Sequence, residues 1–203
     1  MVKNGLVIGK PNAGKTLFII NFASFLGLHR LEAEIEGIDG YKRKTTITTN
    51  QARWDWVSKT PHKTRHLVSI KIHLTAGKGK KRMALKDSTG IMEGIPSDIE
   101  LRKAIGQTLL SIREADLILH IVDTSQILKN DPLLSLGETD YQLAELGRLR
   151  KNYLMLANKI DIPESAKGLC RLKEMFHDIM IIPISALYKT GFSEVREYIR
   201  RNL

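Results

Sequence analysis

The sequence predicts an α/β fold in which a doubly wound, mostly parallel sheet is extended by an antiparallel edge hairpin. Short apolar runs alternate with longer amphipathic stretches, a pattern typical of parallel strands connected by helices on both faces of a sheet. Two further apolar runs follow each other with no helix between them, which indicates the hairpin. The chain has 203 residues, 42% of them hydrophobic, and shows no repeat or linker, so we expect one domain over residues 1–203.

Each element follows from its local pattern. Short apolar runs predict the parallel strands Gly5–Ile8, Met83–Lys86, Leu117–Val122, Tyr153–Ala157 and Ile179–Pro183. Helical spacing of apolar residues predicts helices over Thr16–Leu26, Asp98–Arg113, Tyr141–Arg150, Ala166–Phe176 and Phe192–Arg200. The hairpin is predicted to pair Gln51–Val57 with Leu67–Leu74 around a loop at Thr60–Lys63. Trp54 and Trp56 alternate in its first strand, which would place both indoles on one face.

The stretch GKPNAGKT at residues 9–16 lies between the first predicted strand and the first predicted helix. It satisfies the pattern G-x-x-x-x-G-K-[ST], in which glycines let backbone N–H groups face phosphate oxygens at a helix N-terminus. Lys15 would bridge the β- and γ-phosphates, and the Thr16 hydroxyl would bind Mg²⁺. The alternative is an ordinary strand-to-helix turn. The predicted phosphate contacts are Asn12, Ala13, Gly14, Lys15, Thr16 and Leu17.

A second motif, NKID at residues 158–161, is predicted to select the base of the bound nucleotide. It follows a predicted strand, where loops gather at the carboxyl edge of the sheet. The Asp161 carboxylate can accept both the ring N–H and the exocyclic amine of guanine, a donor pair that adenine does not present. Asn158 would contact the purine edge, and the stem of Lys159 would lie across the ring. Ser185, Ala186 and Leu187 end the next strand and would offer a backbone N–H to the guanine O6.

A third motif, DSTG at residues 87–90, follows the strand Met83–Lys86. Asp87 would hold Mg²⁺ through a water, and the Gly90 N–H would contact the γ-phosphate. A D-x-x-G pattern is weak alone, but it stands here in order between the other two motifs. Together the three motifs predict a site for GTP, GDP and Mg²⁺.

The order GKPNAGKT, TTITT, DSTG, NKID, SAL resembles the translation-factor-related (TRAFAC) class of P-loop GTPases. The stretches DSTGIMEGI and LLSIREADLILHIVDTS are similar to the Obg branch, although Ser88-Thr89 replaces its x-Pro. The resemblance covers the G domain alone, so we expect neither the glycine-rich N-terminal domain of Obg nor the RNA-binding C-terminal domain of Era in this sequence. The resemblance therefore implies an Obg/Era-like G domain that hydrolyses GTP to GDP and phosphate as a molecular switch.

The resemblance also implies two switch segments, about 29–82 with the basic hairpin and about 87–100. Thr46 would bind Mg²⁺ and the γ-phosphate in the GTP state, so Lys15, Thr46 and Gly90 are the implied catalytic residues. Thr45, Thr48 and Thr49 are rivals to Thr46, and a threonine-rich β edge is the structural alternative.

Two residues of the motifs bear on the rate of hydrolysis. Ile91 stands where Ras-like enzymes have the glutamine that orients the attacking water, which implies slow intrinsic turnover. In relatives with G-x-P-N-x-G-K the asparagine can bind K⁺ beside the phosphates, which makes Asn12 a candidate K⁺ ligand. The alternative is that Asn12 only braces the loop.

The net charge of +10 is concentrated between Tyr41 and Arg82, where 12 of the 32 Lys and Arg residues stand with one of the 22 acidic residues. This excess favours RNA or a ribosomal subunit as partner of the segment Lys42–Arg82. The alternatives are an edge strand guarded by charge with the tryptophans in the core, a switch for a protein partner without RNA binding, and binding to anionic lipid.

Two negative observations concern the compartment. A lone cysteine, Cys170, cannot form an intramolecular disulfide, and no apolar run reaches the roughly 18 residues that a membrane span needs. We therefore expect a cytoplasmic protein without integral membrane association. The six histidines are too scattered for a metal-ligand pattern.

Overall fold

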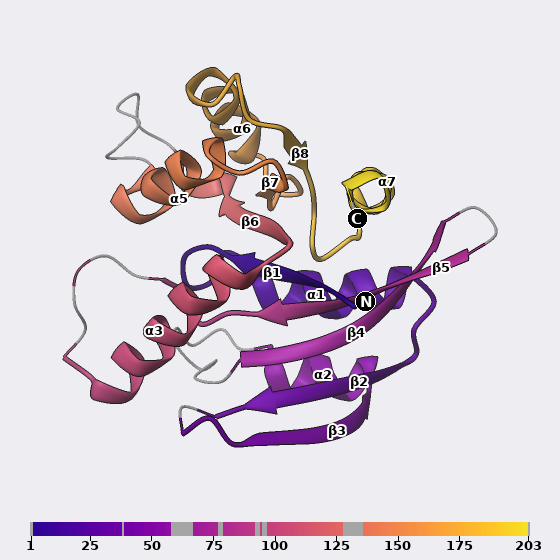
Figure 1. The fold of residues 1–203 in the computed structure, drawn as a ribbon. Coiled ribbons are helices and arrows are strands. Elements are labelled where there is room, and N and C mark those ends of the chain that lie inside the picture. The colour runs from indigo at the N-terminus through magenta and orange to yellow at the C-terminus, as the bar shows by residue number, and fades with distance from the viewer. Residues whose placement is uncertain are drawn as a thin grey trace.

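A computed structural model describes residues 2–37, 39–57, 67–76, 79–91, 94, 97–127 and 136–202, with backbone only for 75, 76, 79 and 80. Within these residues an eight-stranded sheet has the order β3-β2-β4-β5-β1-β6-β7-β8 (Figure 1). The strands are β1 (Lys3–Ile8), β2 (Arg30–Glu36), β3 (Lys42–Thr48), β4 (Leu67–Ala76), β5 (Gly79–Asp87), β6 (Leu117–Asp123), β7 (Tyr153–Asn158) and β8 (Ile181–Pro183). The helices are α1 (Lys15–Phe25), α2 (Thr49–Trp56), α3 (Ile99–Glu114), α5 (Glu138–Arg148), α6 (Ser165–Met175) and α7 (Phe192–Asn202), with a 3₁₀ turn η1 (Thr124–Gln126).

The half of the sheet from β5 to β8 is parallel throughout, with β1 between β5 and β6. Successive strand residues face opposite helix layers, since Val7 packs in one core cluster while Leu6 and Ile8 pack in the other. One cluster contains buried residues of α1, α2 and α7, and the other contains buried residues of α3, α5 and α6. The predicted doubly wound fold is therefore confirmed.

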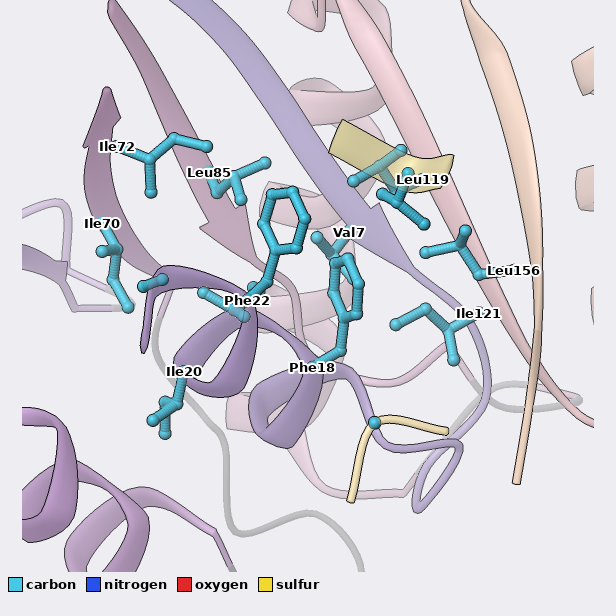
Figure 2. Packing of buried hydrophobic residues seen from close by; sticks show 14 of the residues in the cluster. Val7, Phe18, Ile20, Phe22, Ile70, Ile72, Leu85, Leu119, Ile121 and Leu156 are labelled. Carbon is cyan, nitrogen blue, oxygen red and sulfur yellow. The ribbon is translucent and has the colours of Figure 1, made fainter. Parts of the chain in front are cut away.

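Helix α1 is apolar nearly all round, because it is enclosed between the sheet and neighbouring helices. Figure 2 shows Phe18 and Phe22 of α1 pointing toward Val7, Leu85 and Leu119 on the strands. Phe18 and Phe22 stack with ring centroids 5.3 Å apart, and Phe192 of α7 meets Phe18 edge-on at 5.3 Å. This packing fixes the N-terminus of α1, where the phosphate loop ends, against the strands.

The predicted antiparallel edge exists, but one of its strands was assigned wrongly. β2 pairs antiparallel with β3 and β4, and β4 pairs antiparallel with β5. Leu67–Leu74 lies in β4 as predicted, whereas Gln51–Val57 is not its partner strand. The predicted loop at Thr60–Lys63 lies outside the described residues.

Most of Gln51–Val57 belongs to helix α2 instead. The Thr48 hydroxyl caps this helix by accepting the Gln51 N–H at 3.2 Å. Ala52 is fully buried and Trp56 packs against the same core cluster, whereas Trp54 is 85% exposed. The two tryptophans therefore do not share a face, because helical spacing replaces the alternation expected of a strand.

Strands β2 and β3 were not among the predicted strands, although a threonine-rich β edge was the alternative for the segment around Thr46. Their outer face is a ladder of charges, with Glu36, Glu34 and Glu32 of β2 opposite Lys42, Lys44 and Thr46 of β3. Glu and Lys have low strand propensity, and here cross-strand charge pairing replaces it.

Among the helices that the structure describes, none is both long and apolar enough to cross a membrane.

Candidate functional site

The phosphate loop joins β1 to α1 and depends on two glycines in the left-handed region. Gly9 has φ 140° and Gly14 has φ 100°. A Cβ atom on Gly9 would lie 2.2 Å from the Ile121 carbonyl oxygen, and one on Gly14 would lie 2.4 Å from the Asn158 side-chain nitrogen. Asn12 also has a positive φ, 61°, and its side chain is exposed. The loop therefore needs glycine both for its backbone turn and for its close approach to neighbouring strands.

Lys15, the first residue of α1, is buried beneath this loop. Its Nζ donates hydrogen bonds to the carbonyl oxygens of Lys10 at 2.7 Å and Gly9 at 3.1 Å. Burial lowers the pKa of Lys15 from 10.5 to about 8, and the negative charges of Asp87 and Asp140 oppose this shift. The ammonium is thus directed across the loop, where the phosphates are predicted to bind.

Asp87 and Thr16 meet at the C-terminal end of β5. The Thr16 hydroxyl donates to Asp87 Oδ2 at 2.6 Å, and burial raises the pKa of Asp87 from 3.8 to about 6. The other carboxylate oxygen of Asp87, Oδ1, is buried and has no hydrogen-bond partner among the described residues. A hydroxyl beside a carboxylate with a spare oxygen fits the hard oxygen ligands that Mg²⁺ prefers, bound directly or through water.

The rest of the DSTG motif packs directly on the phosphate loop. The Ser88 hydroxyl donates to the Val7 carbonyl oxygen at 2.7 Å. A Cβ on Gly90 would lie 2.6 Å from the Pro11 nitrogen, so this contact requires glycine. Ile91 is 8% exposed and packs in the core cluster of α5 and α6, while its N–H donates to the Gly9 carbonyl oxygen at 3.3 Å.

Asn158, at the end of β7, connects the base motif to the phosphate loop. Its Nδ2 donates to the Ala13 carbonyl oxygen at 2.7 Å, and its Oδ1 accepts the Ala186 N–H at 2.9 Å. All three residues are buried. The structure therefore brings the phosphate loop, NKID and Ser185–Leu187 into one continuous site, with the Ala186 N–H bonded to Asn158.

The remaining residues predicted to bind the base lie toward solvent. Asp161 is exposed, and its Oδ1 accepts the Ser185 hydroxyl at 2.6 Å. Lys159 has φ 69°, and its Nζ forms an ion pair with Asp123 at the end of β6. Leu187 is 55% exposed, whereas Leu17 is half-buried against the core. Asp161, Lys159 and Leu187 thus lie where a planar base could meet them.

Thr46 is the predicted site residue that the structure does not bring to the others. It is exposed on β3, opposite Glu32 in the strand ladder. Three strands separate β3 from β1, so the two lie roughly 19 Å apart by ordinary strand spacing. Of its rivals, Thr45 is half-buried on β3, Thr48 caps α2 and Thr49 is buried.

Sequence reasoning missed several polar side chains that support the site. Asn21 of α1 is 1% exposed and bonds to the Ala186 carbonyl oxygen and to Arg53 of α2. One signal for Asn21 was available, because it is the lone amide in a helix whose other residues, apart from Lys15, Thr16 and Ser24, are apolar. Asp123 had no such signal, since its partner Lys159 stands 36 residues away in the sequence.

A second missed group is a buried chain of three side chains beside the site. His120 of β6 lies 2.6 Å from the Tyr153 hydroxyl through Nδ1 and 3.0 Å from Asp140 Oδ1 through Nε2. A neutral imidazole protonated on Nε2 satisfies both contacts, since a carboxylate can only accept. Burial, with the Asp140 charge, raises the pKa of Tyr153 well above its usual value.

No cluster of three metal-binding side chains occurs in the part of the chain that the structure describes.

Comparison with known proteins gives this geometry a family. Residues 4–159 match the model of a family described as 50S ribosome-binding GTPase. The chain is 28% identical over 119 residues to GTPase Obg of Desulfatibacillum aliphaticivorans, which covers 58% of this chain and 34% of that protein. It is 33% identical over 115 residues to GTPase Obg of Halalkalibacterium halodurans, covering 55% and 26%. The chain thus spans about a third or less of the length of these curated relatives.

Solved structures agree on the fold. Era of Aquifex aeolicus bound to GDP and AlF4⁻ matches all of this chain and 57% of its own with a TM-score of 0.67 and 20% identity. Era in complex with MgGDPNP and a segment of 16S ribosomal RNA matches the same shares with a TM-score of 0.68 and 23% identity. These likenesses confirm the predicted fold, that of a P-loop GTPase G domain.

Proposed function

The chain belongs to the 50S ribosome-binding GTPase family, and from this membership we propose that it is a slow, Mg²⁺-dependent GTPase acting as a switch on a ribosomal subunit or another RNA. The proposal rests above all on the contact of Asn158 with Ala13 and Ala186, which joins the phosphate and base motifs in one site. Such a switch would be cytoplasmic.

The chain's own residues would bind and orient the nucleotide. Lys15, already aimed across the loop, would exchange its carbonyl contacts for the β- and γ-phosphates. Thr16 and Asp87 would hold Mg²⁺, and the Gly90 N–H would contact the γ-phosphate. Bound Mg²⁺ would neutralise charge that develops on the phosphate oxygens. Asp161, oriented by Ser185, would accept the guanine N–H groups.

Slow turnover follows from Ile91. Its side chain is apolar and buried, so it can neither accept nor donate a hydrogen bond to an attacking water. We expect single-turnover hydrolysis in the purified chain to be well below the roughly 1–10³ s⁻¹ of typical enzymes. A rate inside that range without any partner would contradict this.

The switch segments would be about 29–82 and 87–100. Thr46 lies on β3 in this structure, so its contact with Mg²⁺ and the γ-phosphate would require β3 to leave the sheet edge. Hydrogen exchange of β3 with GDP and with a non-hydrolysable GTP analogue tests this. Identical protection in both states would remove Thr46 from the site.

K⁺ is the proposed second cation. Asn12 has an exposed side chain at the mouth of the phosphate loop, so it can reach an ion beside the phosphates. If Asn12 binds K⁺, hydrolysis is faster in KCl than in NaCl, and Asn12→Ala removes the difference. Equal rates of the unmodified chain in both salts would leave Asn12 only a bracing role.

Three observations support the RNA or ribosomal partner. The matched family is described as ribosome-binding, one structural neighbour was solved with ribosomal RNA, and the chain's net charge of +10 is concentrated in Lys42–Arg82. The test is co-sedimentation with separated ribosomal subunits, with GDP or a non-hydrolysable GTP analogue, at low and moderate salt. Retention only with the analogue, surviving moderate salt, is the expected result.

A second candidate, a switch for a protein partner without RNA binding, is favoured by the charge pairing in the structure. The Lys42 Nζ lies 3.4 Å from Glu36 Oε2 and 3.8 Å from Glu34 Oε1, and the Lys71 Nζ lies 3.2 Å from Glu32 Oε2. Arg53 and Lys81 are also engaged, with Asn21 and with the Arg200 carbonyl oxygen. Acidic residues of β2 thus offset part of the excess that the sequence count assigned to a polyanion.

The groove over β2, β3 and β4 shows the same balance. It has a volume of about 540 Å³ and is lined by Glu32, Glu34 and Glu36 together with Lys42, Lys44, Lys71 and Lys86. Retention by ribosomal subunits that ignores the nucleotide and vanishes with salt would favour this second candidate.

A further inference from the structure

Arg53 and Asn21 lie at the start of a chain of hydrogen bonds that ends in the phosphate loop. The Arg53 Nε–H donates to Asn21 Oδ1 at 2.8 Å, and Asn21 Nδ2 donates to the Ala186 carbonyl oxygen at 2.6 Å. The Ala186 N–H then donates to Asn158 Oδ1 at 2.9 Å, and Asn158 Nδ2 donates to the Ala13 carbonyl oxygen at 2.7 Å. Four bonds therefore connect α2 to the phosphate loop through the base motif.

We infer that Asn21 and Arg53 are positioning residues for guanine selectivity, which act through Ala186 and Ser185 on the carboxylate of Asp161. This inference rests on the proposed guanine site. Neither residue belongs to the nucleotide motifs, and both would act without touching the base.

The orientation of the Asn21 amide is determined by its two partners. A guanidinium can only donate and a carbonyl oxygen can only accept, so Oδ1 must face Arg53 and Nδ2 must face Ala186. Asn21 is 1% exposed, and its neighbours Ile20 and Phe22 are buried apolar residues. A buried amide is costly when one end lacks a partner, so each of its two bonds supports the other.

Ala186 is the residue that this arrangement holds. Its N–H, in the peptide that joins it to Ser185, donates to Asn158, and its carbonyl oxygen, in the peptide that joins it to Leu187, accepts from Asn21, so the peptide on each side of Ala186 is held. The adjacent Ser185 donates its hydroxyl to Asp161 Oδ1 at 2.6 Å. The orientation of Ala186 therefore controls the hydroxyl that orients the carboxylate predicted to read guanine.

Helix α2 gives this chain of bonds a link to the edge of the sheet. Thr48 is both the last residue of β3 and the N-cap of α2, so α2 follows β3 without a spacer. If α2 moves away, the Arg53 bond is lost and the Asn21 carbonyl oxygen is left buried without its partner. By linkage, the position of α2 and the affinity for guanine then depend on each other.

The experiment compares GDP with inosine diphosphate, which lacks the exocyclic amine of guanine. Dissociation constants for both are measured on the full chain with Mg²⁺ and on the variants Asn21→Ala, Asn21→Asp and Arg53→Ala. Gln51→Ala is the matched control, because Gln51 is an exposed residue of the same helix whose side chain lies outside the chain of bonds. Thermal unfolding accompanies each variant.

We expect Asn21→Ala to weaken GDP binding by about fivefold to tenfold, the scale of one lost buried hydrogen bond, and to weaken inosine diphosphate binding less. The selectivity for guanine therefore falls. Asn21→Asp retains the bond from Arg53 but places an oxygen against the Ala186 carbonyl oxygen, so it should also lower the selectivity in a nearly isosteric side chain. Arg53→Ala also lowers the selectivity for GDP over inosine diphosphate. In the Asn21→Ala background, the same substitution changes the selectivity little further.

Equal weakening of both nucleotides in the Asn21 and Arg53 variants, or no change in either, would overturn the inference and leave these residues a purely structural role. Failure of the proposed function looks different, because the unmodified chain would then bind GDP no better than inosine diphosphate or ADP. In that case the inference falls with the site it depends on.

Discussion

The two halves of the sheet differ in what holds them together and in what they do. From β5 to β8 the strands are parallel, and β1, β6 and β7 are buried on both faces over most of their length. β1, β5 and β7 end in the loops of the nucleotide motifs. In β3, β2 and β4 the strands are antiparallel, and the face away from α1 and α2 is a ladder of Glu and Lys. The comparison teaches that geometry is fixed in the first half, while the second keeps an exposed charged face and an open edge strand.

Asp87 should give the largest effect, because it is a buried carboxylate in the parallel half. Its raised pKa favours the native state at pH values below 3.8, and this contribution is lost as pH rises through about 6. The shift corresponds to about 3 kcal/mol of unfolding free energy. We therefore expect ligand-free Asp87→Asn to be more stable than the unmodified chain at pH 7 and the difference to vanish near pH 4.

Urea unfolding from pH 4 to 7 in the presence of a chelator measures this difference directly. Mg²⁺-dependent nucleotide binding should fall in the same variant, since the asparagine amide cannot carry the negative charge of the carboxylate that it replaces. A difference between the two proteins that does not change with pH would show that Asp87 ionises as easily in the fold as in the open chain.

Gly14→Ala should give the next largest effect. The new Cβ would stand 2.4 Å from the Asn158 side-chain nitrogen at a residue with φ 100°, so base and phosphate contacts are disturbed together. We expect GDP affinity to fall by about 100-fold, as measured by isothermal titration. Gly27→Ala is the control, because Gly27 also has a positive φ but nothing lies within 4 Å of its Cβ position. Comparable losses in both variants would mean that backbone strain alone explains the result.

Glu34→Lys should give the smallest effect, because it lies in the antiparallel half. It replaces the attraction between Glu34 and Lys42 with repulsion on an exposed face. We expect a loss of about 0.5–1 kcal/mol of unfolding free energy at low salt, and less at high salt. Glu34→Gln should fall between the two proteins. Nucleotide affinity should stay unchanged, and a fall in GDP binding would show that the two halves are coupled more tightly than the comparison suggests.

The parallel half could be predicted from sequence because its signals are local. Five apolar runs and the helices between them were placed, and the helices begin within three residues of the predicted positions. The antiparallel half was predicted only in part. β2 alternates charged with apolar residues, the pattern of a half-buried strand, and this signal was missed. β3 has a single apolar residue and depends on its cross-strand partners. Gln51–Val57 satisfies both a strand and a helix pattern, and the Thr48 cap with buried Ala52 decides for the helix.

The same distinction applies to the candidate site. Three parts of the site were found because each is a contiguous motif of four to eight residues, in which the residue types and their spacing indicate the chemistry. These motifs are Gly9–Thr16, Asp87–Gly90 and Asn158–Asp161. The assignment of these motifs to nucleotide contacts remains a prediction, as does that of Thr46. Asn21 stands out in the sequence as a lone amide, but its partner could not be assigned, since Ala186 is 165 residues away and the bond exists only after folding.

The hydrogen bond between Asn158 and Ala13 has a consequence for which ligands the site can accept. It makes the separation between the two ends of the site a property of the protein, because the loop and the base motif touch each other directly. A nucleotide then binds to a site whose spacing is already set, and it does not have to bring the phosphate loop and the base motif together. Little ordering entropy remains to be lost on binding, and an analogue whose sugar or linkage alters the span between base and phosphate should be rejected even when both of its ends are correct.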